Sequence, residues 1–236
     1  MKIEKNKPGN TIELPWGRLI NNTWGAPPED TLQSSIFEDE DGSIGWYWNR
    51  PTPRPRPGHG SVEPIYPCLR IGGSPLETSK SPLFPFRWSD CDSLKLELTY
   101  EYTQPPIGSY DLAYDIFFTN ASLPGQNVLR KAEVMIWINA TQKQPPSSYK
   151  GDFSDGANTY TLYSRMLSDG QLYGAFIMKE GDQSGHHTVN AKALMDNLAL
   201  ESEWYVPGID LGNEVWVGSG RIEVKQIAAV VNGKHV

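Results

Sequence analysis

The stretch Ser34-Ser-Ile-Phe-Glu-Asp-Glu-Asp-Gly-Ser-Ile-Gly-Trp-Tyr-Trp48 contains two β-prone runs separated by a turn signal. Asp41-Gly42 lies between the runs, and Asp-Gly is a preferred pair in the tight turns that join antiparallel strands. The same arrangement recurs at Asp169-Gly170, between Tyr160–Leu167 and Leu172–Met178. Two such hairpins predict a body of antiparallel strands.

Strand-like segments fill most of the chain. From about Thr31 to Val230, short runs rich in Val, Tyr, Thr and Trp alternate with turn signals, and no change in composition marks a linker. With 22 glycines and 19 prolines among 236 residues, there is little room for long helices. Hydrophobic residues make up 38% of the chain, which is enough for a core. The sequence therefore predicts one all-β domain formed by residues 1–236.

One segment, Val189–Leu200, has a helical period, and Thr188 is its expected N-cap. Apolar residues recur there at positions i, i+3, i+4 and i+7, namely Ala191, Leu194, Met195 and Leu198. Many strands with a single amphipathic helix predict a β-jelly-roll sandwich of two antiparallel sheets.

The proline-rich segment Pro51–Pro57 has the sequence Pro-Thr-Pro-Arg-Pro-Arg-Pro. Proline fixes φ and lacks a backbone donor, so the segment is predicted to be a stiff, exposed loop. Recognition by a proline-binding module is the less favoured alternative.

Charge and hydropathy exclude several classes of protein. The chain has 21 Lys and Arg against 28 Asp and Glu, a net charge of −7 that argues against binding to nucleic acid. No apolar run approaches the roughly 20 residues that span a bilayer, so no membrane association is expected. The first nine residues lack the apolar segment of a secretion signal. Two alternatives follow: a cytoplasmic protein, or a secreted one whose signal has been removed.

Motifs for metal, phosphate or serine-hydrolase chemistry are absent from the sequence: it has no H-E-x-x-H, P-loop, paired-Asp calcium loop or G-x-S-x-G. Cys68 and Cys91 form no C-x-x-C pair and have no histidine at ligand spacing, so no zinc site is expected. A disulfide and two free thiols are equally compatible with them. Neither a metal nor a cofactor is predicted.

A carboxylate interrupts the apolar run Lys131-Ala-Glu133-Val-Met135-Ile-Trp137-Ile-Asn139. In a strand, side chains alternate, so Glu133, Met135 and Trp137 share one face. Burying a lone carboxylate is costly, so Glu133 is paired, hydrogen-bonded or functional. The structural alternative is a solvated Glu at a strand start, or one paired with Lys131.

Two further acids interrupt apolar strands. Asp115 alternates with Phe117 and Thr119, and Glu214 shares a face with Trp216. Two carboxyl groups in a cleft with flat aromatic rings suit glycoside hydrolysis, in which one acid protonates the leaving oxygen while the other attacks or activates water. The candidate sugar platforms, each with core packing as the favoured alternative, are Trp24, Trp48, Trp137 and Trp216.

Six short motifs follow one another along nearly the whole chain. They are Asn21-Asn22-Thr23-Trp24-Gly25, Gly45-Trp46-Tyr47-Trp48, Tyr66-Pro67 with Gly72, Tyr114-Asp115-Ile116-Phe117, Glu133-Val-Met-Ile-Trp137, and Gly212-Asn-Glu214 with Gly218-Ser-Gly220. This set resembles glycoside hydrolase family 12, the endo-β-1,4-glucanases and xyloglucanases. The resemblance implies a jelly roll whose concave sheet forms an open substrate cleft, and a retaining mechanism.

The resemblance also implies catalytic roles. Glu133 matches the family's nucleophile, Glu214 its general acid/base, and Asp115 the acid that hydrogen-bonds the nucleophile. Retention needs carboxyl groups roughly 5–5.5 Å apart, which acids on neighbouring strands satisfy. Because a close Asp–Glu pair disfavours ionisation of both groups, Asp115 is expected to be protonated or to share a proton with Glu133.

Substrate-binding roles follow from the same resemblance. Asn22 and Trp24 match residues that hold the sugar on the non-reducing side of the cleavage point, and Met135 and Trp137 match cleft residues flanking the nucleophile. The segment Gln144–Gly151 lies where family members carry a loop across the cleft, although its sequence does not match theirs closely.

The resulting prediction is a secreted endo-β-1,4-glucanase that acts as a monomer on cellulose, mixed-linkage β-glucan or their oligosaccharides. A xyloglucan-specific endoglucanase is the close alternative, because a roomier cleft would accept xylosyl branches. A non-catalytic carbohydrate-binding jelly roll would not need the three acids together. A xylanase also pairs two glutamates, but the stretch Glu133–Trp137 favours the glucanase.

Overall fold

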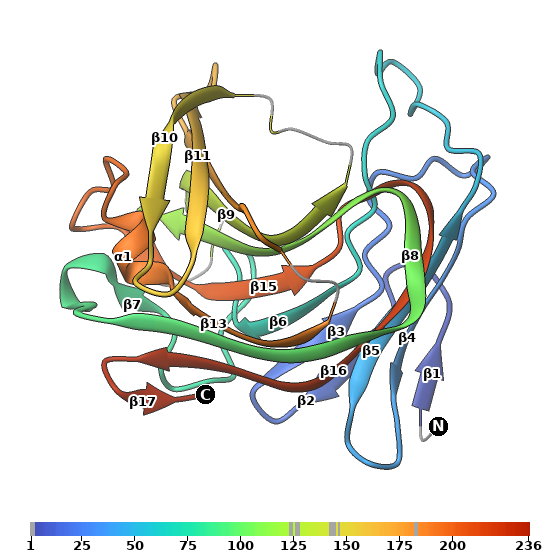
Figure 1. Ribbon diagram of the computed structural model, residues 1–236, viewed down its shortest axis with the longest axis horizontal. Coiled ribbons are helices and arrows are strands. Elements are labelled where there is room, and N and C mark those ends of the chain that lie inside the picture. Colours follow the sequence, from blue (N-terminus) through green and yellow to red (C-terminus); the bar gives the residue numbers. More distant parts are fainter. Residues whose placement is uncertain (1–2, 123–124, 126–127, 142–144, 146, 182–183) are drawn as a thin grey trace.

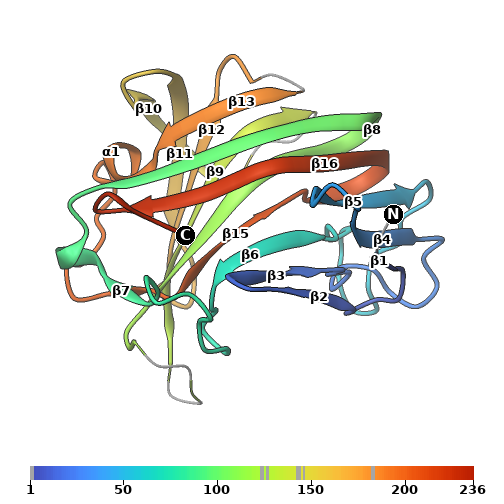
Figure 2. The same cartoon turned by 90° about the horizontal axis from the view of Figure 1, so that it is seen from below.

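Two curved layers of β-strands make up the computed structural model, which describes residues 3–122, 125, 128–141, 145, 147–181 and 184–236 (Figures 1 and 2). The outer layer contains, in order, β13 (Gly185–Asn190), the first part of β8 (Leu94–Thr119), the second part of β16 (Val215–Val231), β5 (Ile44–Arg50), β4 (Gln33–Glu38) and β1 (Ile3–Lys5). The concave inner layer contains, in order, β10 (Ser148–Ser154), β11 (Thr159–Met166), β12 (Leu172–Met178), β9 (Arg130–Thr141), the second part of β8, β15 (Gly208–Gly212), β6 (Cys68–Gly72), β3 (Gly17–Ile20) and β2 (Thr11–Leu14).

Short elements complete the margins of the sandwich. They are β7 (Phe86–Arg87), the 3-10 turn η1 (Trp88–Asp90), the helix α1 (Ala191–Met195), β14 (Tyr205–Val206) and β17 (Lys234–His235). β14 pairs with β7 and with the end of β8, while β17 pairs with the end of β16.

The long strands β8 and β16 belong to both layers and run side by side through a common bend, visible at the right of Figure 1. Gly108 and Gly218 face each other at this bend, with φ of 101° and 115°. A Cβ on Gly108 would lie 2.1 Å from the Val217 carbonyl oxygen, and one on Gly218 would lie 1.8 Å from that of Ile107. The crossing from one layer to the other therefore requires glycine on both strands.

Both predicted hairpins are confirmed. β4 pairs antiparallel with β5 around Asp41-Gly42, and β11 pairs antiparallel with β12 around Asp169-Gly170. One pairing departs from the antiparallel prediction, because β12 lies parallel to β9. Parallel neighbours need a long connection, which the β10–β11 hairpin provides here. This arrangement raises β10 and β11 beside the open face of the inner layer (Figure 1).

The core lies between the layers and includes Trp48, which the sequence offered as a sugar platform. That assignment is wrong, because the Trp48 side chain is fully buried. Its ring packs against Tyr102 and Tyr110, with centroids 6.4 Å away in each case. Trp48 lies on the same face of β5 as Ile44 and Trp46, so alternation directs it between the sheets.

The predicted helix is present but much shorter than Val189–Leu200, since α1 contains only Ala191–Met195. Its N-cap is Asn190, whose side chain accepts from the Ala193 N–H, and not Thr188. Thr188 and Val189 belong to β13, which pairs with β8 through Asn190. Residues 188–190, which the helical period assigned to the start of the helix, are therefore paired in the sheet instead.

The remaining expectations about loops and thiols are resolved by the structure. Pro51–Pro57 is irregular and mostly exposed, as predicted. Cys68 and Cys91 are buried free thiols, so the disulfide alternative is wrong. Within the described ranges, the chain has no helix of the length and apolarity needed to cross a bilayer.

A buried ion pair ties the end of β5 to the loops beside the cleft. Arg50 and Asp30 have fully buried side chains, and their closest atoms, Nη2 and Oδ2, are 2.7 Å apart. The Arg50 guanidinium also donates to the carbonyl oxygens of Glu63, Val215 and Gly25 at 2.6–3.1 Å. Arg50 thereby holds together three segments that each contribute residues to the cleft lining, at Trp24, Glu63 and Trp216.

Substituting Asp30 by alanine is expected to lower the free energy of unfolding by about 3–5 kcal/mol, because Arg50 would stay buried without its counter-charge. Urea unfolding followed by tryptophan fluorescence would measure the change. Asp152→Ala, which removes an exposed ion pair with Lys179, serves as the control and should leave the midpoint nearly unchanged. Equal effects of the two substitutions would contradict this account of Arg50.

Candidate active site

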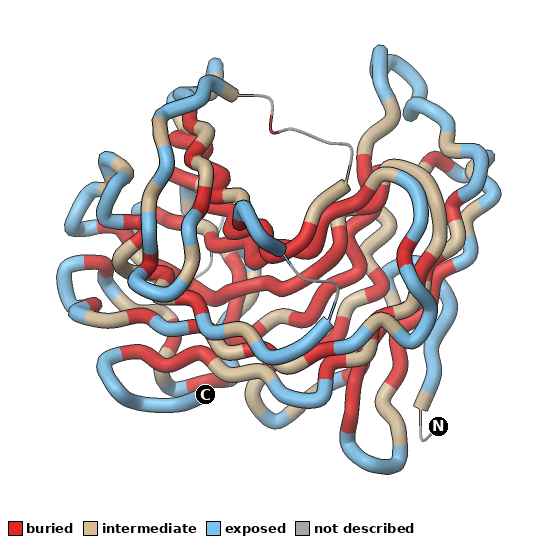
Figure 3. The backbone as a smooth tube through the Cα atoms, in the orientation of Figure 1, coloured by how far each residue is buried: buried red, intermediate tan, exposed pale blue. Residues whose placement is uncertain are grey.

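An open cleft of about 900 Å³ lies on the concave face of the inner layer. The strands beneath it are buried along most of their length, as the red segments of Figure 3 show. The seven residues to which the family resemblance assigns catalytic or substrate-binding roles all line this cleft: Asn22, Trp24, Asp115, Glu133, Met135, Trp137 and Glu214. They come from four separate stretches of the chain, which the fold brings to one surface.

Alternation along β9 positions Glu133 as the sequence predicts. Glu133, Met135 and Trp137 line the cleft, whereas Val134 and Ile136 are fully buried between the layers. Met135 and Trp137 form a small apolar cluster under the cleft and are almost completely buried. The Trp137 ring is therefore part of the cleft floor and not an exposed platform.

Arg130 is the ion-pair partner of Glu133, in place of the Lys131 considered from sequence. Arg130 Nη1 donates to Glu133 Oε2 at 3.1 Å. The guanidinium lies 4.3 Å from the centre of the Phe117 ring. Burial raises the pKa of Glu133, and Arg130 opposes that rise by stabilising the carboxylate.

Asp115 lies on β8, directly opposite Met135 of β9. It is only 7% exposed, and Oδ1 has no hydrogen-bond partner among the described residues. Burial raises the pKa of Asp115 well above its usual range, and the carboxyl groups of Glu133, Asp210 and Glu214 raise it further. Asp115 therefore keeps its proton to a higher pH than an ordinary aspartate does.

Glu214 follows β15 and is held through its backbone by Asp111. The Glu214 N–H donates to Asp111 Oδ1 at 3.2 Å, and the Asp111 N–H donates to the Glu214 carbonyl at 3.0 Å. The preceding Asn213 donates to the Asp111 carbonyl at 2.6 Å and accepts from Trp46 Nε1 at 2.8 Å. These buried contacts fix where the Glu214 side chain enters the cleft.

Asp111 was not nominated from sequence, although it occupies the same alternating positions of β8 as Asp115. Burial raises its pKa well above the usual range, and the Glu214 carboxyl raises it further. Asp210 was also missed. It lines the cleft from β15, where it is the single acid in Gly208-Ile-Asp-Leu-Gly212, the same signal that nominated Asp115.

Aromatic side chains lie at the margin of the cleft. Trp24 is 48% exposed, and its N–H donates to Asn22 Oδ1 at 3.2 Å. Trp216 is partly exposed and lines the cleft beside Glu214. These two rings, in contrast to Trp137, present surface to solvent that a sugar ring would cover.

Two loop segments discussed from sequence, Pro51–Pro57 and Gln144–Gly151, can be placed relative to the cleft. In the part of the chain that the structure describes, Ser61–Pro64 lines the cleft and Pro51–Pro57 does not. The prediction for Gln144–Gly151 falls partly outside the described residues, because 142–144 and 146 are not among them. Pro145 lines the cleft.

Metal binding finds no support in the described ranges, where no group of three or more His, Cys, Asp and Glu side chains is arranged to hold an ion. The cleft offers the chemistry of three carboxyl groups: Glu133 is paired with Arg130, Asp115 is buried with a raised pKa, and Glu214 lies at the junction of β15 and β16. A concave β-sandwich cleft that combines such acids with exposed indole rings defines a carbohydrate-hydrolysing enzyme.

The chain belongs to glycosyl hydrolase family 12, whose family model matches residues 19–232. It is 25% identical over 217 residues to Endoglucanase S of Pectobacterium parmentieri, which covers 88% of this chain and 79% of that protein. A family 12 xyloglucanase from Bacillus licheniformis has a TM-score of 0.85 at 24% identity, covering 98% of this chain and 100% of that one. Endoglucanase cel12A from Rhodothermus marinus has a TM-score of 0.78 at 19% identity, with both chains fully covered.

These comparisons confirm the family, the jelly-roll fold and the prediction of a glycoside hydrolase. They also favour an enzyme over the non-catalytic carbohydrate-binding module that the sequence left as an alternative. The substrate class that follows from the family is a polysaccharide.

Proposed function

We propose that this protein is a retaining endo-β-1,4-glucanase, formed by the chain as a single catalytic domain, that cleaves cellulose or mixed-linkage β-glucan. The observation that carries the proposal is the presence of Glu133 and Glu214 on one open cleft, each reached from a different part of the sheet. An open cleft suits an internal stretch of a long polymer better than a chain end. The name of the Pectobacterium parmentieri relative supports the same activity.

The proposed reaction is a double displacement. A Glu133 carboxylate oxygen attacks the anomeric carbon, the bond from that carbon to the leaving oxygen breaks, and Glu214 gives its proton to the leaving oxygen. Glu214, now ionised, takes a proton from water, whose oxygen attacks the anomeric carbon and releases Glu133. The product keeps the β configuration, and both glutamates return to their starting states.

Arg130 and Asp115 prepare Glu133 for this role. Arg130 favours the ionised form of Glu133, which the attack requires. Asp115, neutral and buried beside it, adds no second negative charge to the floor of the cleft. Of the two neighbouring acids Glu133 and Asp115, Glu133 is thus the ionised one and acts as the nucleophile.

Reducing-sugar release on carboxymethyl cellulose, barley β-glucan, xyloglucan and xylan would test the substrate, with Glu133→Gln as the inactive reference. Activity on the first two substrates, with a rapid fall in viscosity, is expected. Activity on xyloglucan alone would favour the xyloglucan-specific alternative, and activity on xylan alone would overturn the assignment to glucan.

Substituting Trp24 by alanine is expected to raise KM for polysaccharide about two- to tenfold with little change in kcat, because a stacking contact of about 0.5–1.5 kcal/mol is lost. Trp24→Phe keeps a flat ring at the same position and should retain most of the affinity. Steady-state kinetics on barley β-glucan measure both. An unchanged KM in Trp24→Ala would show that the ring does not contact substrate.

The substrate also bears on location and assembly. A polymeric β-glucan cannot cross a membrane, so we propose that the enzyme is secreted and meets its substrate outside the cell. We further propose a monomer, because Asp115, Glu133 and Glu214 meet within one fold and the proposed reaction needs no residue from a second copy. Size-exclusion chromatography with light scattering would test the monomer.

A further inference from the structure

Two acids face each other across neighbouring strands of the cleft floor. Asp115 of β8 is the direct register partner of Asp210 of β15, and both line the cleft. They are only 7% and 5% exposed. Side chains directly opposite on antiparallel strands have Cβ atoms about 4.5–5.5 Å apart, and like charges there are destabilising. The two carboxyl groups therefore do not both ionise easily.

Asp210 is the member of this pair that has a guanidinium partner of its own. Its two oxygens accept from Arg70 Nε and Nη2 at 2.8 and 2.7 Å, a bidentate contact typical of ionised partners. Burial by itself lowers the pKa of Arg70, but the Asp210 carboxylate more than reverses this effect and raises it. Arg70 and Asp210 thus form a fixed cation and anion.

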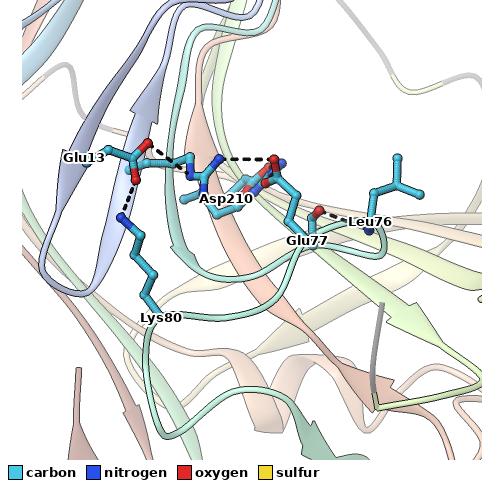
Figure 4. A network of polar contacts seen from close by, with 8 residues as sticks. Glu13, Leu76, Glu77, Lys80 and Asp210 are labelled. Carbon is cyan, nitrogen blue, oxygen red and sulfur yellow. Dashed lines mark hydrogen bonds and ion pairs between the residues drawn. The ribbon is translucent and has the colours of Figure 1, made fainter. Parts of the chain in front are cut away.

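Arg70 also belongs to a chain of ion pairs that continues to Lys80 (Figure 4). Arg70 Nη1 contacts Glu77 at 2.9 Å, and Glu77 contacts Arg18 at 3.1 Å. Arg18 lies 3.8 Å from Glu13, which in turn pairs with Lys80. This ion-pair chain alternates in sign from Lys80 to Asp210, so Arg70 cannot easily turn toward another partner.

Among the residues that the structure describes, Asp115 has no comparable cation of its own. Arg130 acts on it favourably but is engaged with Glu133, and Asp115 Oδ1 has no hydrogen-bond partner in the described ranges. The titratable groups that interact with Asp115 are Arg130 and Glu133 on β9, Asp210 on β15, Glu214 after it, Tyr66 before β6, Cys68 at the start of β6, Tyr173 on β12, and Asp111 on β8 itself. The balance of these charges is negative.

We propose that Asp210, held as an anion by Arg70, is a positioning residue that keeps the proton on Asp115. The inference rests on the proposed function, in which Glu133 is the anionic nucleophile. In this arrangement Asp115 is neutral and lies between two carboxylates on the cleft floor, Glu133 and Asp210. Each carboxylate is paired with an arginine, Arg130 for Glu133 and Arg70 for Asp210. The proton on Asp115 avoids a third negative charge between these two carboxylates.

The test is the pH dependence of kcat/KM for an activated aryl β-cellobioside, such as the 2,4-dinitrophenyl compound. Departure of this leaving group needs no proton from Glu214, so the alkaline limb of the profile does not report that residue. The substitution Asp210→Asn removes the anion that faces Asp115, so Asp115 loses its proton at a lower pH. The alkaline limb of the profile is therefore expected to shift by about one unit toward lower pH.

Glu13→Gln is the matched control, because it removes a carboxylate from the same ion-pair chain outside the cleft. Its alkaline limb should coincide with that of the wild type. An unmoved limb in Asp210→Asn, or equal movement in both variants, would overturn the proposal. Failure of the proposed function itself would give a different result. The Glu133→Gln variant would then keep full activity, whatever the pH profile of Asp210→Asn.

A second measurement requires neither activity nor a folded Asp210 variant. Infrared spectra of the wild type and of Asp115→Asn at pH 7 should differ by the carbonyl stretch of one protonated carboxylic acid, present only in the wild type. Absence of that band from the wild type would overturn the proposal by showing that Asp115 is ionised.

Discussion

Glu133→Gln is expected to reduce hydrolysis of β-glucan by at least about 10⁴-fold, which corresponds to about 5 kcal/mol of transition-state stabilisation. The amide cannot form the glycosyl ester, and it also exchanges the anion that Arg130 holds for a neutral group. Initial rates on barley β-glucan, with enzyme concentration raised for the variant, would measure the loss.

Glu97→Gln makes the same chemical change elsewhere on the sheet and is the control for Glu133→Gln. Glu97 lies in the outer-layer part of β8, where it pairs with Thr188 and Ala228 and does not line the cleft. The activity of the Glu97→Gln variant should equal that of the wild type. A folded Glu133→Gln variant with comparable activity would remove Glu133 from the reaction.

Glu214→Gln is expected to lose about 10³-fold in kcat/KM on polysaccharide, because the leaving sugar departs as an alcohol only if its oxygen is protonated. On the activated aryl β-cellobioside the loss in kcat/KM should be under about tenfold, since that leaving group departs as an anion. Comparison of the two substrates with one enzyme preparation would measure this difference. Equal losses on both would mean that Glu214 supports the fold of the site and is not the acid.

The candidate acids were accessible from sequence because each stands among alternating apolar residues, although Glu214 lies between β15 and β16 and only Glu133 and Asp115 lie within strands. Alternation placed Glu133, Asp115 and Glu214 on cleft-facing positions, and the structure brings them to one surface. What alternation does not give is the order of strands across the sheet. Asp210 opposes Asp115 only because β15 inserts between β8 and β6, a pairing between segments far apart in the chain.

Other differences arose where two local signals competed. The helical period of Val189–Leu200 was real, but pairing of β13 with β8 extended the strand to Asn190 and left α1 with five residues. Trp48 was predicted as a sugar platform because it is a tryptophan within one of the six motifs. Its side chain lies on the face of β5 that points into the core. Arg130 displaced Lys131 as the partner of Glu133 because the register of β9 against β8 shifts between Ala132 and Arg130, so Lys131 is an extra residue there and simple alternation no longer holds.

The measurement that tests the central claim most directly is covalent trapping with 2-deoxy-2-fluoro-β-cellobiosyl fluoride, a substrate whose glycosyl-enzyme forms faster than it hydrolyses. After proteolysis, mass spectrometry should find one fluorocellobiosyl group on the peptide that contains Glu133, attached to that side chain. A label on any other residue, or turnover that inverts the anomeric configuration without a trapped intermediate, would contradict the account.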